Sequence, residues 1–352
     1  MTVSTFFFLF FIFLFFCINI LINVDFVVAK PDSWWESFKN GWWDYFFGGT
    51  QALPPNAISN DINNCLFKYW TAAGGNAHPA LSGNVECTSL NPSHYWPLCY
   101  GLNTLAPSQF ASCYDDTNLT PVFTGNIVKP VSGSGRAPGF IADTGPYKPT
   151  PQAAVDDYNS GRQETDFPGF DVKKQYFCSK GHFTPNSDFG PIDERSLTFI
   201  TTNIAPQWQK FNGGNWATLE NDVRAYVTAK NRQVYVFTGV GGAAKNLAGV
   251  PYKMNGRVQA PQYYWKLICD PVIKQMVVYV GKNSVGSKSI TKHSGCRGRM
   301  LTEELGVMQC GSQQNIKSNP AYSDFKMPTM HNTNCPSAVR GTFLDTYTNN
   351  FK

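Results

Sequence analysis

The cysteines are the feature that most constrains how this chain can fold. The 352-residue sequence has ten of them, and Cys17 lies inside an apolar run at the N-terminus. The other nine are scattered from Cys65 to Cys335 without any C-x-x-C pair, which argues against a zinc ribbon. Scattered cysteines in an exported chain usually pair as disulfides. Because nine is odd, at least one thiol is free or bonded to another chain.

The N-terminus has the pattern of an export signal. An apolar run over residues 6–24 precedes Ala29, a small residue suited to a cleavage site, although a positive n-region is missing. We predict a signal peptide over residues 1–29, secretion, and no stable membrane association after its removal. The run is nearly long enough to cross a bilayer, so an uncleaved anchor is the alternative. The sequon Asn118-Leu119-Thr120 predicts a glycoprotein.

Composition favours strands and loops over a helical bundle. Aromatic residues make up 15% of the chain, and Gly and Pro number 30 and 23. The net charge is +5 and becomes +6 without residues 1–29, which hold one acid and no base. This mild basic excess is compatible with a polyanionic partner.

Hydrophobic periodicity predicts four strands and one helix. The strands are expected over residues 196–202, 233–239, 263–269 and 276–281. The helix is expected over residues 212–229, where apolar side chains recur at helical spacing. The loop over residues 129–140 separates a cysteine-containing region of unknown role, residues 30–130, from a domain over residues 131–352.

Three polar residues share the non-apolar side of the predicted helix: Asn212, Glu220 and Arg224. An Asn oxygen is a neutral ligand that suits Mg²⁺, a carboxylate can orient the waters that the ion keeps, and an Arg can face a phosphate. The alternative is an ordinary solvated face with one ion pair.

His182 follows Lys180 and Gly181, and we expect Gly181 to permit an unusual backbone angle that exposes the imidazole. Imidazole is the side chain best suited to remove a proton from water near neutral pH. A histidine base, an Asn-held metal and an arginine together form a set that can cleave phosphodiesters.

The segments KGHFTPNSDF and TTNIAPQWQKFNGGNWATLENDVR resemble the DNA/RNA non-specific endonucleases of the ββα-metal (His-Me finger) class. They are most similar to the secreted arthropod branch, which includes duplex-specific and dsRNA-degrading nucleases. The resemblance is dense over residues 176–224 and implies an α+β fold. A central antiparallel sheet with a ββα-metal motif is expected, beside a disulfide-stapled, strand- and loop-rich N-terminal region. Residues 131–352 would then be the endonuclease domain.

The resemblance also implies roles for single residues. His182 becomes the general base, Asn212 the direct ligand of Mg²⁺ (with Mn²⁺ as a substitute), Glu220 the residue that holds metal-bound water, and Arg224 a phosphate contact. The family has a further arginine upstream, for which Arg136 fits better than the competitor Arg162.

One departure from the family pattern lies next to the histidine. The family sequence Asp-Arg-Gly-His is replaced here by Ser179-Lys180-Gly181-His182, and Lys180 keeps the charge without the fork of arginine. We expect Lys180, Trp208 and Lys210 to contact substrate. For Trp208, core packing is the alternative to stacking on a base.

The leading interpretation is a secreted, Mg²⁺-dependent endonuclease that hydrolyses DNA, RNA or both, including duplexes, with little sequence preference. The first alternative is a secreted nucleic-acid-binding protein of the same fold with little turnover. The second is a disulfide-rich extracellular protein that shares only a short motif.

Overall fold

The computed structural model describes residues 55–62, 65, 87, 93–102, 108–133, 135, 139–159, 163–164, 170–245, 249–283 and 305–348. All of them belong to one compact unit of the chain, Ala52–Lys352. The predicted signal peptide and both candidate upstream arginines, Arg136 and Arg162, lie outside these ranges. Within these ranges the helices are too short or too polar to cross a membrane.

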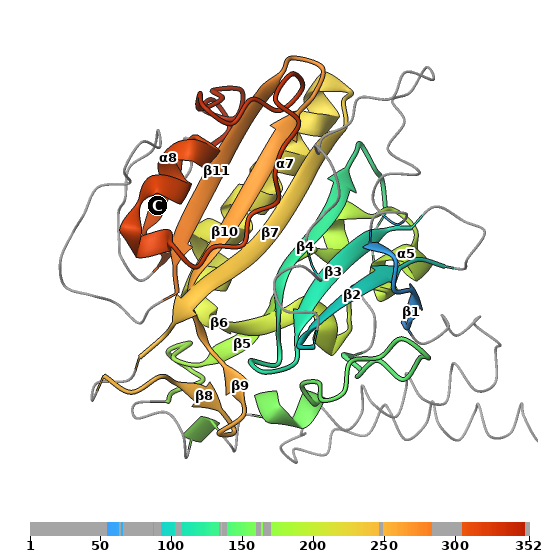
Figure 1. The fold of residues 1–352 in the computed structure, drawn as a ribbon, viewed down its shortest axis with the longest axis vertical. Coiled ribbons are helices and arrows are strands. Elements are labelled where there is room, and N and C mark those ends of the chain that lie inside the picture. The colour runs from blue at the N-terminus through green and yellow to red at the C-terminus, as the bar shows by residue number, and fades with distance from the viewer. Residues whose placement is uncertain are drawn as a thin grey trace, which may run out of the picture. The chain divides into compact units, whose positions relative to one another are not determined.

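An eight-stranded antiparallel sheet forms the centre of the fold (Figure 1). Its strand order is β1-β2-β3-β4-β7-β10-β11-β12, and every neighbouring pair is antiparallel. The strands are β1 (Ala57–Ser59), β2 (Tyr95–Tyr100), β3 (Phe110–Asp115), β4 (Thr120–Val128), β7 (Val234–Ala243), β10 (Pro261–Asp270), β11 (Gln275–Lys282) and β12 (Met308–Gly311). The central antiparallel sheet that the resemblance implies is confirmed, as are the strands expected near residues 233–239, 263–269 and 276–281.

Strands from both sides of residue 130 belong to this one sheet. β4 pairs with β7, with Phe123 opposite Gly239 and Val128 opposite Val234. Gly239 makes room for the packing here, because a Cβ atom would lie only 2.1 Å from the ring of Trp265. The sheet therefore continues across the boundary that the sequence predicts at residue 130.

Disulfides fasten both ends of the described fold. Cys65–Cys99 and Cys87–Cys113 tie loop residues to β2 and β3, and Cys269–Cys335 ties the C-terminal segment to β10. Cys310 is also disulfide-bonded. Among the described cysteines Cys178 is the free one, and it is buried, which agrees with the odd count in the sequence.

Each face of the sheet is covered by its own apolar cluster. Adjacent strand residues point to opposite faces, so Val236, Tyr264 and Val277 join one cluster while Phe237, Trp265 and Val278 join the other. The first cluster includes residues of helix α7 (Ala217–Lys230), which lies against the sheet in Figure 1. The second includes residues of helix α8 (Gln313–Ser318) and of the segment that follows it.

The predicted helix forms, but its beginning is irregular. Helical backbone runs through α6 (Gln209–Phe211), the π-helical segment η4 (Asn212–Trp216) and α7 (Ala217–Lys230). α7 ends at Asn231 in the left-handed conformation, with φ of 48°. Its expected apolar residues, Trp216, Leu219, Val223 and Val227, are all buried. The periodicity therefore predicted the buried face correctly and missed the π-helical segment.

The remaining elements are short. They are the hairpin β5 (Cys178–His182) and β6 (Ile204–Trp208), the hairpin β8 (Lys253–Met254) and β9 (Val258–Gln259), helix α5 (Ile192–Ser196), and the 3₁₀ turns η1 (Val155–Tyr158), η2 (Asn186–Asp188), η3 (Thr201–Asn203) and η6 (Pro320–Tyr322). Together β5, β6 and the helix that follows them make a β-β-α unit.

The prediction of a strand over residues 196–202 is wrong. The segment contains the end of α5, a turn and η3, and the strand β6 begins only at Ile204. Local side-chain hydrogen bonds compete with strand pairing here. Thr198 Oγ1 donates to the Arg195 carbonyl oxygen at 2.8 Å, and Asn203 Nδ2 donates to the Thr198 carbonyl oxygen at 2.9 Å. These bonds hold the backbone in turns despite its β-branched composition.

Burial of α7 leads to a first prediction. Leu219→Ala should lower the free energy of unfolding by about 2–5 kcal/mol, because the side chain is fully buried and a cavity would remain. Urea titration with the disulfides intact measures this loss. The matched control is Thr228→Ala, an exposed residue of the same helix, which should change stability by less than about 0.5 kcal/mol. Equal effects of both variants would contradict the packing of α7 described above.

Candidate active site

The β5–β6 hairpin carries His182 as the last residue of β5. The strands pair in register from Cys178 opposite Trp208 to His182 opposite Ile204. Beyond His182, the Thr184 backbone N–H donates to Asn203 Oδ1 at 3.0 Å, and Asn203 Nδ2 donates to the Thr184 carbonyl oxygen at 2.9 Å. This reciprocal pair fixes the chain as it leaves the histidine.

Aromatic rings enclose the imidazole of His182. Its ring centroid lies 5.0 Å from that of Phe140 and 5.0 Å from that of Phe199. The side chain is half-buried, and its Nε2 atom is shielded from solvent. The two rings therefore restrict rotation of the imidazole and hold it away from bulk water.

Gly181 serves a different purpose from the one that the sequence suggested. The expectation of an unusual backbone angle is wrong, because Gly181 lies inside regular strand β5 and is not among the residues with positive φ. A Cβ atom at this position would lie 2.4 Å from the Cβ atom of Gln207. Glycine is thus required for the space that the buried Gln207 side chain occupies.

Asn212 is tied to the same hairpin. Its Nδ2 donates to Ser179 Oγ at 3.0 Å, and Ser179 Oγ donates to the Gln207 carbonyl oxygen at 3.0 Å. Because Nδ2 makes this bond, the contact with Ser179 does not use the Oδ1 atom of Asn212. Side-chain alternation places Ser179 and His182 on opposite faces of β5, so the residue that holds Asn212 and the histidine lie on different faces of the strand.

The site residues that could receive a metal are neutral amides. In the described ranges no three His, Cys, Asp or Glu residues cluster as a metal site. The side-chain amide of Gln207 is buried without a hydrogen-bond partner among the described residues, and its backbone carbonyl already accepts from Ser179. Amide oxygens of this kind suit a hard cation that keeps most of its waters. The arrangement is therefore chemically suited to a hard divalent cation.

Glu220 lies beside a buried lysine. Its Oε1 is 3.9 Å from Lys266 Nζ, and Lys266 Nζ donates to Thr238 Oγ1 at 2.6 Å. The ammonium group also lies 5.1 Å from the centre of the Trp216 ring. Burial raises the pKa of Glu220 to about 7, against the opposing effects of Lys266 and Arg224. Burial likewise lowers the pKa of Lys266, opposed by Glu220. Near neutral pH this carboxyl can therefore exchange a proton.

Arg224 is held by an acidic residue on the turn after the histidine. Its Nη1 donates to Asp188 Oδ1 at 2.9 Å, and its Nη2 donates to Asn221 Oδ1 at 2.7 Å. Asp188 is buried in η2, and its Oδ2 accepts from Asn126 Nδ2 at 3.0 Å. A partly buried, charge-assisted pair of this kind sets the direction of the guanidinium.

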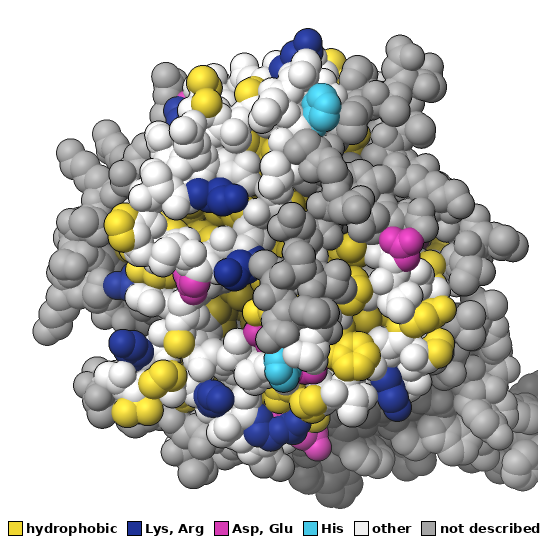
Figure 2. Space-filling view, viewed as in Figure 1, with side chains coloured by type: hydrophobic (Ala, Val, Ile, Leu, Met, Phe, Trp, Pro, Cys, Tyr) yellow, Lys and Arg dark blue, Asp and Glu magenta, His cyan; other side chains and the backbone are white. Residues whose placement is uncertain are grey.

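The three residues expected to contact substrate, Lys180, Lys210 and Trp208, lie in three different environments. Lys180 lies 5.7 Å from the ring centre of Phe140, on the same face of β5 as His182, and Lys210 lies 4.7 Å from the ring centre of Tyr176. Trp208 is 2% exposed and belongs to the apolar core, so it packs inside the protein and presents no free ring face to a base. Lysine and arginine residues on the face shown in Figure 2 are scattered, with some acidic side chains between them, and form no single patch on its described surface.

Sequence reasoning missed Asp188, Lys266 and Ser179. Asp188 lies six residues after His182 in the very stretch that carries the resemblance. Lys266 interrupts the apolar segment YYWKLIC, and a lysine inside a buried strand requires a nearby partner. Ser179 was noted only as a departure from the family pattern, whereas it supports Asn212.

Comparison with known proteins assigns the family. The model of the DNA/RNA non-specific endonuclease family matches residues 99–296, which is more than half of the chain. The chain belongs to this family. The match includes His182, Asn212, Glu220 and Arg224, together with strands β3 to β11.

Individual relatives agree with this assignment. A salivary endonuclease of Lutzomyia longipalpis is 28% identical over 192 residues, covering 50% of this chain and 46% of the relative. A salivary endonuclease of Culex quinquefasciatus is 27% identical over 117 residues, covering 32% of each. A nuclease of Nostoc sp. is 30% identical over 90 residues, covering 25% of this chain and 30% of the relative. The chain thus spans about half or less of the length of these relatives.

A solved structure, EndoG in the EndoG/EndoGI complex, is 22% identical and covers 53% of this chain and 76% of that chain. With a TM-score of 0.33, this likeness adds nothing to the family assignment.

The Asp188–Arg224 pair leads to a second prediction. Asp188→Ala should destabilise the protein by about 2–4 kcal/mol, because it leaves Arg224 without its buried carboxylate and Asn126 without its acceptor. Thermal or urea unfolding measures the change. Asp171→Ala removes the exposed Asp171–Lys174 pair and should have little effect. If the two variants lose the same stability, the pair does not anchor Arg224.

Proposed function

We propose that this protein is a secreted, Mg²⁺-dependent endonuclease that hydrolyses phosphodiester bonds of DNA, RNA or both, with little sequence preference and with duplexes among its substrates. Membership of the non-specific endonuclease family carries the proposal. The position of His182, Asn212 and Arg224 around one β-β-α unit supports it.

In the proposed reaction His182 is the general base. The imidazole removes a proton from the attacking water, and the rings of Phe140 and Phe199 hold it in one orientation. Phosphodiester hydrolysis then needs a second group that neutralises the leaving oxygen.

Asn212 is the proposed direct ligand of the metal, through the Oδ1 atom that Ser179 leaves available. A bound Mg²⁺, or Mn²⁺ in its place, supplies positive charge to the scissile phosphate and the leaving oxygen. Glu220 is the proposed residue that holds metal-bound water, and Lys266 lies beside its carboxylate.

Arg224 is the proposed contact to the scissile phosphate. Asp188 and Asn221 hold the guanidinium in place, and it still has donors for phosphate oxygens. Lys180, on the same face of β5 as His182, adds positive charge. The upstream arginine of the family is assigned to Arg136, with Arg162 as the competitor.

Export is the second part of the proposal. The apolar segment 6–24 and the predicted signal peptide 1–29 direct secretion, and the disulfides require an oxidising compartment. Two of the relatives are salivary endonucleases. Asn118 lies in the turn between β3 and β4, where a glycan would face the surface, although its Nδ2 donates to Asp115 at 2.7 Å.

The alternative function is a secreted nucleic-acid-binding protein with little turnover. Two observations favour it: Ser179-Lys180 replaces the Asp-Arg of the family pattern, and Nε2 of His182 is shielded from solvent. A panel of dsDNA, ssDNA, dsRNA and ssRNA, tested with Mg²⁺ and with EDTA, separates the two functions. Binding in both conditions without cleavage in either would select the alternative.

The third prediction concerns the base. His182→Ala should reduce cleavage of plasmid DNA and dsRNA by roughly 10²–10⁴-fold, the range of general-base contributions. Initial rates at saturating Mg²⁺ measure the loss. His94→Ala is the control, because His94 is an exposed histidine whose Nδ1 lies 3.0 Å from Asp116 in a different part of the fold. Cleavage by His182→Ala at the parent rate would refute the assignment.

The fourth prediction concerns the metal and does not depend on activity. Asn212→Ala should weaken Mn²⁺ binding by about tenfold or more, because it removes the proposed direct ligand. Titration followed by electron paramagnetic resonance of free Mn²⁺ measures the affinity. His182→Ala serves as the matched variant and should retain Mn²⁺ binding. Unchanged affinity in Asn212→Ala would exclude Asn212 as the ligand.

A further inference from the structure

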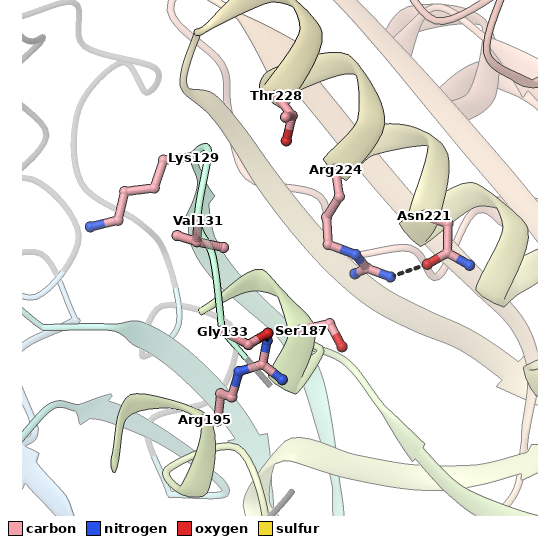
Figure 3. A pocket seen from close by; sticks show the side chains of 8 residues that line it. All are labelled: Lys129, Val131, Gly133, Ser187, Arg195, Asn221, Arg224 and Thr228. Carbon is pink, nitrogen blue, oxygen red and sulfur yellow. Dashed lines mark hydrogen bonds between the residues drawn. The ribbon is translucent and has the colours of Figure 1, made fainter. Parts of the chain in front are cut away.

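A cavity beside α7 has a lining suited to an anion. Its volume is about 330 Å³, and we call it the α7 hollow (Figure 3). One wall comes from α7, and the other comes from the segment that follows β4, from η2 and from α5. The lining residues are Lys129, Val131, Gly133, Ser187, Arg195, Asn221, Arg224 and Thr228. Three of these eight are cationic and none is acidic. Because Arg224 is paired with Asp188, the positive charge of the hollow comes chiefly from Lys129 and Arg195.

Arg195 contributes a charge that meets no carboxylate among the described residues. The residue is 7% exposed, and its guanidinium donates to the carbonyl oxygens of Gly190, Gly135 and Gly133 at 3.2, 3.1 and 2.8 Å. Three of its five N–H groups are used in this way, so two remain. A buried cation whose partners in the described part of the chain are all neutral carbonyls attracts an anion strongly.

The wall that carries Arg195 is closely packed. Gly133 packs so closely on Gly190 that a Cβ atom would lie 2.1 Å from the Gly190 carbonyl oxygen, and Arg195 bonds to both glycines. The segment after β4 is thereby clamped to the turn before α5. The charge in the hollow is held in place before any ligand arrives.

Two guanidinium groups line the hollow from opposite walls. In Figure 3 Arg224 extends from α7 and Arg195 extends toward it from the opposite wall. Like charges that face one another repel, and an anion between them turns repulsion into attraction. Lys129 extends away from α7 in the same view, so its amine lies at the rim.

Neutral donors complete the lining. Asn221 Oδ1 accepts from Arg224, which leaves its amide N–H groups for an acceptor. Thr228 and Ser187 add hydroxyls, and the contact from Ser187 Oγ to Asn186 Oδ1 is long at 3.4 Å. This combination of guanidinium, amide and hydroxyl donors, without a carboxylate, matches the oxygens of a phosphodiester.

We propose that the α7 hollow binds a second backbone phosphate of the polynucleotide, next to the phosphate that is cut. The inference rests on the proposed function. Arg224 belongs to both places, and Ser187 in the hollow directly precedes Asp188, which holds Arg224. A strand whose scissile phosphate lies at Arg224 therefore places a neighbouring phosphate in the hollow. The contact reads no base and fixes only the register of the backbone.

The test compares two charge changes on one helix. Thr228→Glu places a carboxylate in the hollow, whereas Ala229→Glu places the same charge on the next exposed residue, about 100° around α7 and outside the lining. Both are exposed and near the same helix end, so their effects on folding should match, and urea titration verifies this. Arg195 is not substituted, because it holds the backbone.

Two substrates separate the hollow from the cutting site. A dinucleoside monophosphate has only the scissile phosphate, and a long polynucleotide also has its neighbours. Thr228→Glu should raise KM for the polynucleotide roughly tenfold more than it raises KM for the dinucleoside monophosphate. The change should be larger in KM than in kcat. Ala229→Glu should show no such difference.

Lys129→Ala should lower the slope of log affinity against log salt by about one, measured by polynucleotide binding in EDTA.

The outcomes distinguish this inference from the proposed function. If the parent protein cuts polynucleotide but Thr228→Glu and Ala229→Glu behave alike on both substrates, the α7 hollow does not bind phosphate and the proposed function stands. If the parent neither binds nor cuts nucleic acid, the proposed function fails and the inference fails with it.

Discussion

The packing of the helix after β6 against the sheet is the constraint on which the rest of the structure depends. Trp216, Leu219, Val223 and Val227 bury one side of that helix among residues of β7, β10 and β11. Once this side is buried, the directions of Glu220 and Arg224 are fixed, because helical residues are related by a constant rotation. The same burial places Asn212 at the start of the helix, against the β5–β6 hairpin.

The site is built from charges that the fold buries and then partners. Lys266 is 2% exposed and faces Glu220 and Thr238, while Asp188 lies between Asn126 and Arg224. Burying either charge without its partner would cost free energy. Within each pair, one side chain restricts the orientation of the other. The result is a set of side chains whose directions are set by the fold, as the proposed stabilisation of a phosphate would require.

Local patterns predicted some elements well and others poorly. The strands near residues 233–239, 263–269 and 276–281 were recovered because they pair within a broad sheet that buries both faces. The strand expected over residues 196–202 failed because hydrogen bonds of Thr198 and Asn203 hold turns there. Gly181 was singled out correctly, but the reason was steric contact with Gln207, a residue of the neighbouring strand that sequence spacing does not reveal.

The sequence alone determined the family, through the stretch from Tyr176 to Arg224, and the expectation of disulfides, through its scattered cysteines. It also determined which side of the helix is buried, since that depends only on spacing along the chain. Only the tertiary structure decided that Asp188 faces Arg224, that Lys266 faces Glu220, and that Arg195 lines a hollow with Arg224. These contacts join residues from separate strands and turns, and their geometry exists only after the sheet has brought those segments together.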